Sequence, residues 1–280
     1  MKELHVSTIT EAIAEACKAS CFDLPEDVES AIIASVSKEE SPIGREILEQ
    51  LIENSRIGRE ELIPICQDTG FTVVFVELGQ DIHISGGWIV DAINEGVRRG
   101  YKEGFLRKSI VSHPLDRVNT GDNTPAVVHV DVVPGSQLRM VVVPKGGGCE
   151  NMSALKMLKP SDGVDGVKKF VVDTVVSGGP NPCPPIIVGV GIGGTMDKAA
   201  LLAKKAILRK IGMPSSNPRD AELEKELLDL VNSSGIGPMG LGGRITALAV
   251  NVESFPAHIA SLPVAVNIQC HSARQKEIIL

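Results

Sequence analysis

The stretch that decides the fold is Ile63-Pro64-Ile65-Cys66-Gln67-Asp68-Thr69-Gly70, a loop between two apolar segments of different periodicity. Upstream, a helical pattern ends near Glu61, and downstream the continuous apolar run 71–76 predicts a buried strand. Cys66 therefore falls at a helix-to-strand junction, where loops hold functional residues. A lone cysteine beside apolar residues is more often a small buried side chain, so the interpretation of Cys66 depends on the rest of the chain.

Composition narrows the class of protein. The chain has 280 residues, of which 43% are hydrophobic and 22% charged, enough for one large domain or two smaller ones. The net charge of -7 gives no basic surface for nucleic acid, and one Trp and one Tyr leave little for base stacking. No apolar run approaches the roughly 18 residues of a membrane helix, and the N-terminus lacks a secretory signal. We expect a cytoplasmic protein that binds neither nucleic acid nor membranes.

The cysteines are scattered through the chain, which favours reduced thiols or metal ligands over a disulfide framework. They are Cys17, Cys21, Cys66, Cys149, Cys183 and Cys270. Cys17 lies on the apolar face of a predicted helix and Cys21 just past it. We expect both in the core, because no His or further Cys follows nearby to complete a metal site. The other four fall on loops or at strand ends, at intervals too long for a zinc ribbon or a ferredoxin motif.

The periodicity of the chain predicts one continuous α+β domain over 1–280, with a helical layer at 1–60 and an α/β region at 61–280. The first helix starts at the capping box Thr8-Ile9-Thr10-Glu11. The third has Ser41 as N-cap and Ile43 among its inward residues. Further along, the alternating stretches 126–133 and 137–143 flank Pro134-Gly135-Ser136 and predict a hairpin.

Two glycine-rich loops suggest binding to anions. Lys145-Gly146-Gly147-Gly148 predicts a cradle of backbone N–H groups, with a flexible turn as the alternative. Gly189, Gly191 and Gly194 fit G-x-G-x-x-G between a predicted strand and helix, which raises dinucleotide binding. The acidic residue expected about 20 positions later is missing, so this interpretation is a minor alternative.

Cys183 lies in the run Pro180-Asn181-Pro182-Cys183-Pro184-Pro185. Prolines on both sides exclude a helix and a regular strand at this point. A thiol on so rigid a loop is expected to be held in position. Together, converging thiols, carboxylate, His and Arg side chains and glycine loops would suit a metal cluster that binds a substrate oxygen.

Five separated motifs make a family resemblance specific. They are Ile65-Cys66-Gln67-Asp68-Thr69-Gly70, Asn119-Thr120-Gly121-Asp122-Asn123-Thr124-Pro125-Ala126, Lys145-Gly146-Gly147-Gly148, Cys183-Pro184-Pro185 and Cys270-His271-Ser272. In this order they resemble class I fumarate hydratases and tartrate dehydratases, and the chain looks like the α subunit of a two-subunit iron–sulfur hydro-lyase. The resemblance implies that Cys66, Cys183 and Cys270 ligate a [4Fe–4S] cluster, and that Cys149 is a neighbour of the site.

The resemblance also implies roles for residues around the cluster. Asp68 is the candidate for proton transfer, with His258 as a second catalytic residue. Arg107 would bind a carboxylate of a dicarboxylate substrate in bidentate fashion, and the remaining hydrogen-bond donors to substrate would be Gln67, Gly147 and Gly148. The alternatives are a solvated surface charge for Arg107 and a structural histidine for His258.

The implied activity is reversible hydration of fumarate to malate, a reaction of the tricarboxylic acid cycle, with tartrate dehydration as the alternative. A cysteine-nucleophile enzyme using Cys66 or Cys183 with His258 is a second class, and a non-catalytic cluster or subunit-interaction protein is a third. Because only ten residues follow Cys270 and Arg107 is the one obvious cationic fork, we expect a β subunit to complete the site. The expected assembly is an αβ pair or α2β2.

Overall fold

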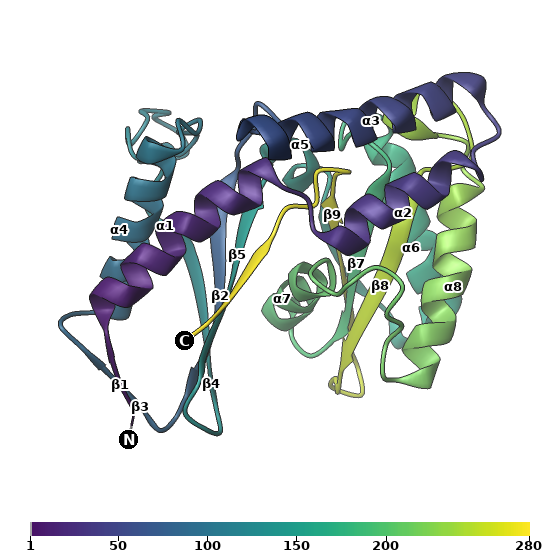
Figure 1. Cartoon of the computed structure of the whole chain (residues 1–280). Coiled ribbons are helices and arrows are strands. Elements are labelled where there is room, and N and C mark those ends of the chain that lie inside the picture. Colours follow the sequence, from purple (N-terminus) through teal and green to yellow (C-terminus); the bar gives the residue numbers. More distant parts are fainter. Residues whose placement is uncertain (1) are drawn as a thin grey trace. The chain divides into compact units, whose positions relative to one another are not determined.

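The computed structural model describes residues 2–280, which form two compact units (Figure 1). Unit 1 comprises the described residues up to Pro25, then Ser55–Gly147 and Arg274–Leu280. Unit 2 comprises Glu26–Asn54 and Gly148–Ala273. Each unit combines helices with a mixed sheet, which confirms the predicted α+β class. Each is also assembled from stretches that are separate in the sequence.

Unit 1 is built on a four-stranded sheet in the order β10-β5-β2-β4. The strand β2 (Phe71–Gly79) runs antiparallel to β5 (Leu138–Lys145) and parallel to β4 (Val127–Val133). The edge strand β10 (Lys276–Ile279) is antiparallel to β5. A separate parallel pair joins β1 (Lys2–His5) to β3 (Ile82–Ser85). The sequence patterns had not indicated β1, β3 or β10.

The predicted hairpin of residues 126–133 and 137–143 is wrong, because β2 lies between β4 and β5. The N–H of Gly79, where β2 ends, donates to the carbonyl of Gln137 at 2.9 Å, and the N–H of Gln80 to that of Val133 at 2.8 Å. Residues 134–136, which connect β4 to β5, therefore pass around the end of β2. Residues 72–76 of β2 are all buried, and a strand so buried is expected in the interior of a sheet.

The helices α1 (Val6–Phe22) and α4 (Ile89–Glu103) pack closely together in unit 1 (Figure 1). Gly96 of α4 makes this possible, since a Cβ there would come within 2.7 Å of the Ile13 Cβ. The predicted capping box is wrong. The helix begins at Val6, and the Nδ1 of His5 accepts the N–H of Ser7 at 3.2 Å. Cys21 accordingly lies within α1, not past it, and both Cys17 and Cys21 are buried as expected.

The helices α2 (Glu26–Val36) and α3 (Pro42–Glu61) complete the three predicted N-terminal helices. Ser41 caps α3 as predicted, because its hydroxyl accepts the N–H of Gly44 at 3.2 Å. Ile43 is 55% exposed, so its predicted inward position is wrong: in the first turn of α3 the buried residue is Gly44. α1 falls in unit 1 and α2 in unit 2. A single domain with one helical layer stays a prediction.

Unit 2 contains a second four-stranded sheet, in the order β6-β9-β7-β8. Its strands are β6 (Ala154–Leu158), β9 (Leu262–Gln269), β7 (Ile186–Gly193) and β8 (Ala247–Phe255). The helices α6 (Gly163–Gly178) and α8 (Pro218–Asn232) cover one face, and α7 (Met196–Ala206) covers the other (Figure 1). Three short helices complete the chain: α5 (Gly147–Glu150), η1 (Pro160–Asp162) and η2 (Pro238–Gly240).

The G-x-G-x-x-G motif has a packing function. Gly189 and Gly191 lie inside β7, whereas the sequence predicted a turn. Since side chains alternate along a strand, Val188 and Val190 face α6 and α8 while the glycines face α7. A Cβ at Gly191 would come within 2.0 Å of the Ala199 carbonyl oxygen. The glycines are explained by close helix–strand contact, which removes the basis for dinucleotide binding.

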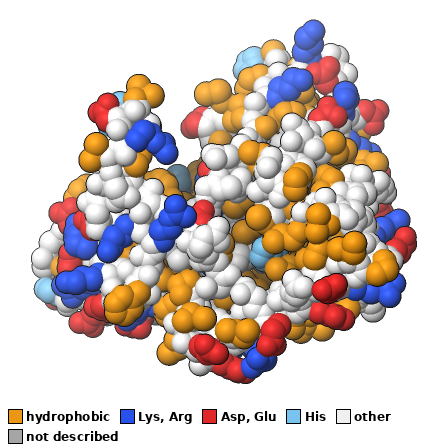
Figure 2. Space-filling model, turned by 90° about the horizontal axis from the view of Figure 1, so that it is seen from above, with side chains coloured by type: hydrophobic (Ala, Val, Ile, Leu, Met, Phe, Trp, Pro, Cys, Tyr) orange, Lys and Arg blue, Asp and Glu red, His pale blue; other side chains and the backbone are white. Residues whose placement is uncertain are grey.

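Charged side chains of both signs lie on the surface. On the face shown in Figure 2, Lys and Arg side chains lie among Asp and Glu side chains. No helix within residues 2–280 combines the length and the apolar character that a membrane span requires.

We predict that Gly191→Ala lowers the free energy of unfolding by about 3 kcal/mol, because the new Cβ collides with the backbone of α7. Gly178→Ala is the matched control. It is also buried, but its Cβ would approach the Met152 side chain no closer than 3.4 Å and alanine is the better helix former. Urea unfolding of the three proteins makes the comparison, and equal stability of Gly191→Ala and wild type would contradict the packing role.

Candidate functional site

The loop 62–70 joins α3 to β2, as the sequence predicted. Cys66 is half-buried on this loop, and Ile65 next to it is buried. Gly70 closes the loop at φ +81°, a conformation that favours glycine. A Cβ at Gly70 would come within 2.6 Å of the Pro144 carbonyl carbon, so the loop lies directly against the end of β5.

Asp68 connects two of the sequence motifs. Its Oδ1 accepts the N–H of Gly70 at 3.0 Å, and its Oδ2 accepts the N–H of Gly147 at 2.8 Å. The structure thus brings the Cys66 loop and the first predicted donor of the glycine triplet together. Each carboxylate oxygen can accept a further hydrogen bond, because an ionised carboxylate has about four acceptor positions. Gly147 already has an acceptor within the chain, and its donation to a substrate stays a prediction.

Arg107 is attached to the same loop through its backbone. The hydroxyl of Thr69 donates to the Arg107 carbonyl at 3.1 Å, and the Arg107 side chain is exposed. Asn123, fully buried at φ +63°, donates to the Gly70 carbonyl at 3.3 Å and accepts the N–H of Ser109 at 2.7 Å. The motif that begins at Asn119 therefore anchors the Arg107 segment beside Asp68.

Within unit 2, the structure brings the Cys183 and Cys270 segments together. Cys183 is exposed at φ +55°, an uncommon conformation for a residue with a side chain that concentrates at functional sites. Cys270 follows β9 directly and is half-buried. The N–H of His271 donates to the Cys183 carbonyl at 3.4 Å, and the His271 Nδ1 lies 3.0 Å from the same oxygen. A Cβ at Gly148 would lie 3.5 Å from the carbonyl oxygen of Asn181, in the same loop.

Two predicted residues receive no further support from the geometry. Gln67 is exposed, and the Cys66 thiol lies 3.4 Å from its Oε1. His258 is exposed on the turn between β8 and β9, where its Nδ1 accepts the N–H of Ala260 at 3.1 Å. Within the described part of unit 2, His258 makes no hydrogen bond to Cys183 or Cys270. Their roles stay predictions.

The remaining cysteines differ from the three candidate ligands in burial. Burial raises the pKa of Cys21 to about 11, although Arg274 opposes the shift, and it raises the pKa of Cys17 further. Both thiols therefore stay protonated and pack in the core. Cys149 is also buried, and its thiol lies 3.6 Å from the Oε1 of Gln269, the residue before Cys270. It is a neighbour of a candidate ligand, as the resemblance implied.

The donor chemistry fits a thiolate-bound cluster. The six cysteines, all among the described residues, form no disulfide bond, and the three candidate ligands are the three that are exposed or half-buried. Iron–sulfur clusters are held by Cys thiolates, and a thiol must lose its proton to bind. Within residues 2–280, neither unit alone has three metal-binding side chains close enough together to hold a metal ion. The candidate ligands are divided between the units, with Cys66 in unit 1 and the other two in unit 2.

The chain is similar to known proteins over nearly its whole length. The family model "Fumarate hydratase (Fumerase)" matches residues 10–279. A protein of Methanocaldococcus jannaschii named putative L(+)-tartrate dehydratase subunit alpha is 47% identical over 273 residues, which are 95% of each chain. The L(+)-tartrate dehydratase subunit alpha of Escherichia coli strain UTI89 is 35% identical over 278 residues, 98% of this chain and 91% of that one. The Shigella boydii protein of the same name is 34% identical over 283 residues, 100% and 93% of the two chains.

The fold and the site motifs are therefore those of a hydro-lyase, an enzyme that adds water to a double bond or removes it. The chain belongs to the fumarate hydratase family and corresponds over nearly its whole length to the α subunits named above.

Asp122 belongs to the motif that anchors the Arg107 segment, and it gives a prediction for stability as a function of pH. Partial burial alone would raise the pKa of Asp122, but hydrogen bonds from Thr124 and Arg98 outweigh it and lower the pKa to about 2. A carboxyl with a depressed pKa stabilises the fold above its unfolded pKa of about 3.9, and this contribution is lost as the pH falls towards 2. We expect Asp122→Asn to lower the free energy of unfolding at pH 7 by about 1 kcal/mol, since solvent reduces the full effect.

Urea unfolding at pH 7, 5 and 3 tests this expectation, and the gap between wild type and Asp122→Asn should narrow at pH 3. Asp116→Asn is the control, because the Asp116 side chain is 73% exposed. A gap of the same size at all three pH values would contradict the assignment.

Proposed function

We propose that this chain is the α subunit of an iron–sulfur hydro-lyase that reversibly hydrates fumarate to malate. Tartrate dehydration is the second candidate, favoured by the names of the relatives. One observation carries the proposal: the Asp68 carboxylate is fixed by the N–H groups of Gly70 and Gly147, on a loop that also carries Cys66 and is bonded to Arg107. The candidate proton acceptor, one candidate thiol ligand and the backbone of the candidate carboxylate-binding arginine therefore lie on connected segments of unit 1.

We propose that Cys66, Cys183 and Cys270 hold a [4Fe–4S] cluster. When bound, a cluster with three thiolate ligands supplies an open iron as Lewis acid for the substrate hydroxyl and carboxylate. Within unit 2, the hydrogen bond from the N–H of His271 to the Cys183 carbonyl supports the pairing of Cys183 with Cys270.

The chain's own residues then account for binding and proton transfer. Arg107 presents a planar guanidinium that can donate two parallel hydrogen bonds to a substrate carboxylate. The free lone pairs of the Asp68 carboxylate accept the proton from the carbon adjacent to the second carboxylate, and return it in the hydration direction. Because both Asp68 oxygens are already held by backbone N–H groups, the acceptor needs little reorganisation when substrate binds.

We propose that a β subunit completes the site, as an αβ pair or α2β2. The relatives carry the designation subunit alpha, which implies at least one further subunit in those enzymes. A dicarboxylate carries two negative charges, and Arg107 is the one guanidinium among the predicted site residues. Cations from a second chain would balance the remaining charge and help to exclude water from the site.

We predict that Cys66→Ser, Cys183→Ser and Cys270→Ser each lose most of the bound iron after anaerobic reconstitution, because a serine hydroxyl is a poor substitute for a thiolate. Iron and sulfide analysis, with the visible absorption of the cluster, measures the loss. Cys149→Ser is the matched control, since its thiol is buried beside a candidate ligand segment but is not assigned as a ligand. Full iron content in Cys183→Ser would rule out the assignment.

We predict that the anaerobic complex of this chain with its β subunit hydrates fumarate, and that Asp68→Asn retains the cluster while kcat falls by about 10²-fold or more. The amide preserves the shape of the carboxylate but removes the proton acceptor. Activity is measured on fumarate, malate and tartrate, by absorbance or coupled product assay. Activity on tartrate alone would select the second candidate, and full activity of a colourless, iron-free protein would support the cysteine-nucleophile class instead.

A further inference from the structure

Three consecutive carbonyl groups in the Cys66 loop are hydrogen-bonded by buried side chains from three different segments of unit 1. The Nη2 of Arg274 donates to the Asp68 carbonyl at 2.7 Å. The single hydroxyl proton of Tyr101 is shared between the carbonyls of Thr69, at 2.6 Å, and Gly70, at 3.1 Å. Asn123 also donates to Gly70. Arg274 is 1% exposed, and Tyr101 and Asn123 are 0% exposed.

These donors are needed because the loop has no regular structure at this point. Thr69 and Gly70 are buried, and a buried carbonyl without a hydrogen-bond partner costs about 1–3 kcal/mol. A helix or a sheet would supply backbone N–H groups, but here side chains supply the donors. Arg274 adds a charged donor, whose hydrogen bonds are shorter and stronger than those between neutral groups.

The burial of an arginine calls for a local explanation, because arginine is almost never fully buried unless it is paired. Arg274 is the largest of the fully buried side chains within residues 2–280. Tyr101 remains a donor at any physiological pH, since burial raises the pKa of its hydroxyl well above 10. Both side chains therefore present fixed donors to the loop.

We propose that Arg274 and Tyr101 are positioning residues for Asp68: they fix the peptide groups of residues 68–70, so that the Asp68 carboxylate meets the N–H groups of Gly70 and Gly147. This rests on the proposed role of Asp68 in proton transfer. Asp68 is held at both ends, by Arg274 at its carbonyl and by the two amides at its carboxylate. Releasing the carbonyl lets the peptide plane rotate, and the carboxylate moves with it.

The consequence for catalysis is specific. Misplacement of a reacting group by about 1 Å can cost about 10²-fold in rate. Substrate binding through Arg107 does not use the Asp68 carbonyl, so KM is affected much less. A loosened loop should therefore lower kcat and leave KM within about 3-fold. Because unfolded protein would also lower the apparent kcat without changing KM, kcat is calculated per folded, cluster-containing protein.

Hydrogen–deuterium exchange of the full complex tests the positioning directly, in Arg274→Lys and in the milder Tyr101→Phe. The reporters are the amides of Gly70 and Gly147, which donate to the Asp68 carboxylate, and the reference is residues 73–76 at the centre of β2. We expect exchange at both reporters to become about 10-fold faster or more while the reference changes little. Steady-state kinetics of the same variants should show kcat reduced by about 10–100-fold.

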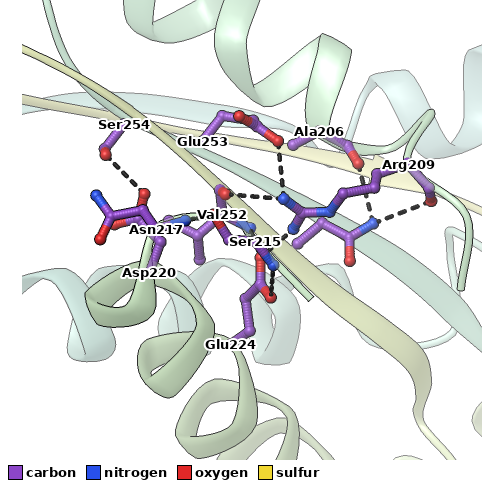
Figure 3. Close-up of polar contacts among 10 residues, drawn as sticks. Ala206, Arg209, Ser215, Asn217, Asp220, Glu224, Val252, Glu253 and Ser254 are labelled. Carbon is purple, nitrogen blue, oxygen red and sulfur yellow. Dashed lines mark hydrogen bonds and ion pairs between the residues drawn. The ribbon is translucent and has the colours of Figure 1, made fainter. Parts of the chain in front are cut away.

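Arg209→Lys is the matched control. Arg209 is also a largely buried arginine that donates to a backbone carbonyl, that of Val252 at 3.4 Å, and it pairs with Glu224 and Glu253 in unit 2 (Figure 3). Replacing Arg209 by lysine should lower the melting temperature. It should not change amide exchange at Gly70 and Gly147, and kcat should stay at the wild-type value.

The proposal is overturned if folded Arg274→Lys and Tyr101→Phe keep wild-type exchange at both reporters, or if exchange rises equally at the β2 reference. Should Arg274→Lys fail to fold, Tyr101→Phe decides by the same criteria. If the wild-type complex hydrates no dicarboxylate, the proposed function fails, while the exchange data still decide whether these side chains order the loop.

Discussion

The hydrogen bonding of a short, buried, irregular loop is the constraint on which the unit 1 part of the site depends. Residues 68–70 cannot satisfy their carbonyls within a helix or a sheet, so Arg274, Tyr101 and Asn123 satisfy them from distant positions in the chain. The packing of α4 against α1 places Tyr101, and the Asn119 motif places Asn123. Several separate elements of unit 1 thus contribute side chains that hold three loop residues, 68–70, in place.

The helices of the N-terminal region were predictable because their signals are local. Ser41 followed by Pro42 marked the start of α3, and the spacing of Ile9, Ile13 and Cys17 marked the buried face of α1. The position of β2 between β4 and β5 was not predictable, since strand pairing depends on residues far apart in sequence. The glycines of β7 gave a wrong prediction of a turn for a related reason. A G-x-G pattern has the same spacing whether the glycines face a phosphate or a helix.

In the candidate site, too, some residues could be predicted from the sequence and others could not. Asp68, Arg107 and Gly147 were identified by family resemblance, and the structure groups them through Thr69 and the Asp68 carboxylate. Arg274 and Tyr101 were missed because nothing in their sequence context distinguishes a buried donor from a surface or core residue. The available signal was weak: an arginine two residues after the C-terminal cysteine motif.

Unit 1 is assembled from stretches that are far apart in the sequence, and this has a consequence for folding during synthesis. β5 is complete once residue 145 has been made, whereas its neighbour β10 ends at Ile279. At about 5–20 residues per second, the ribosome needs on the order of ten seconds to supply the missing strand. During that interval the nascent sheet has an open edge at β5, with unpaired N–H and C=O groups that another chain can engage. Chaperone demand should therefore be highest in the second half of translation.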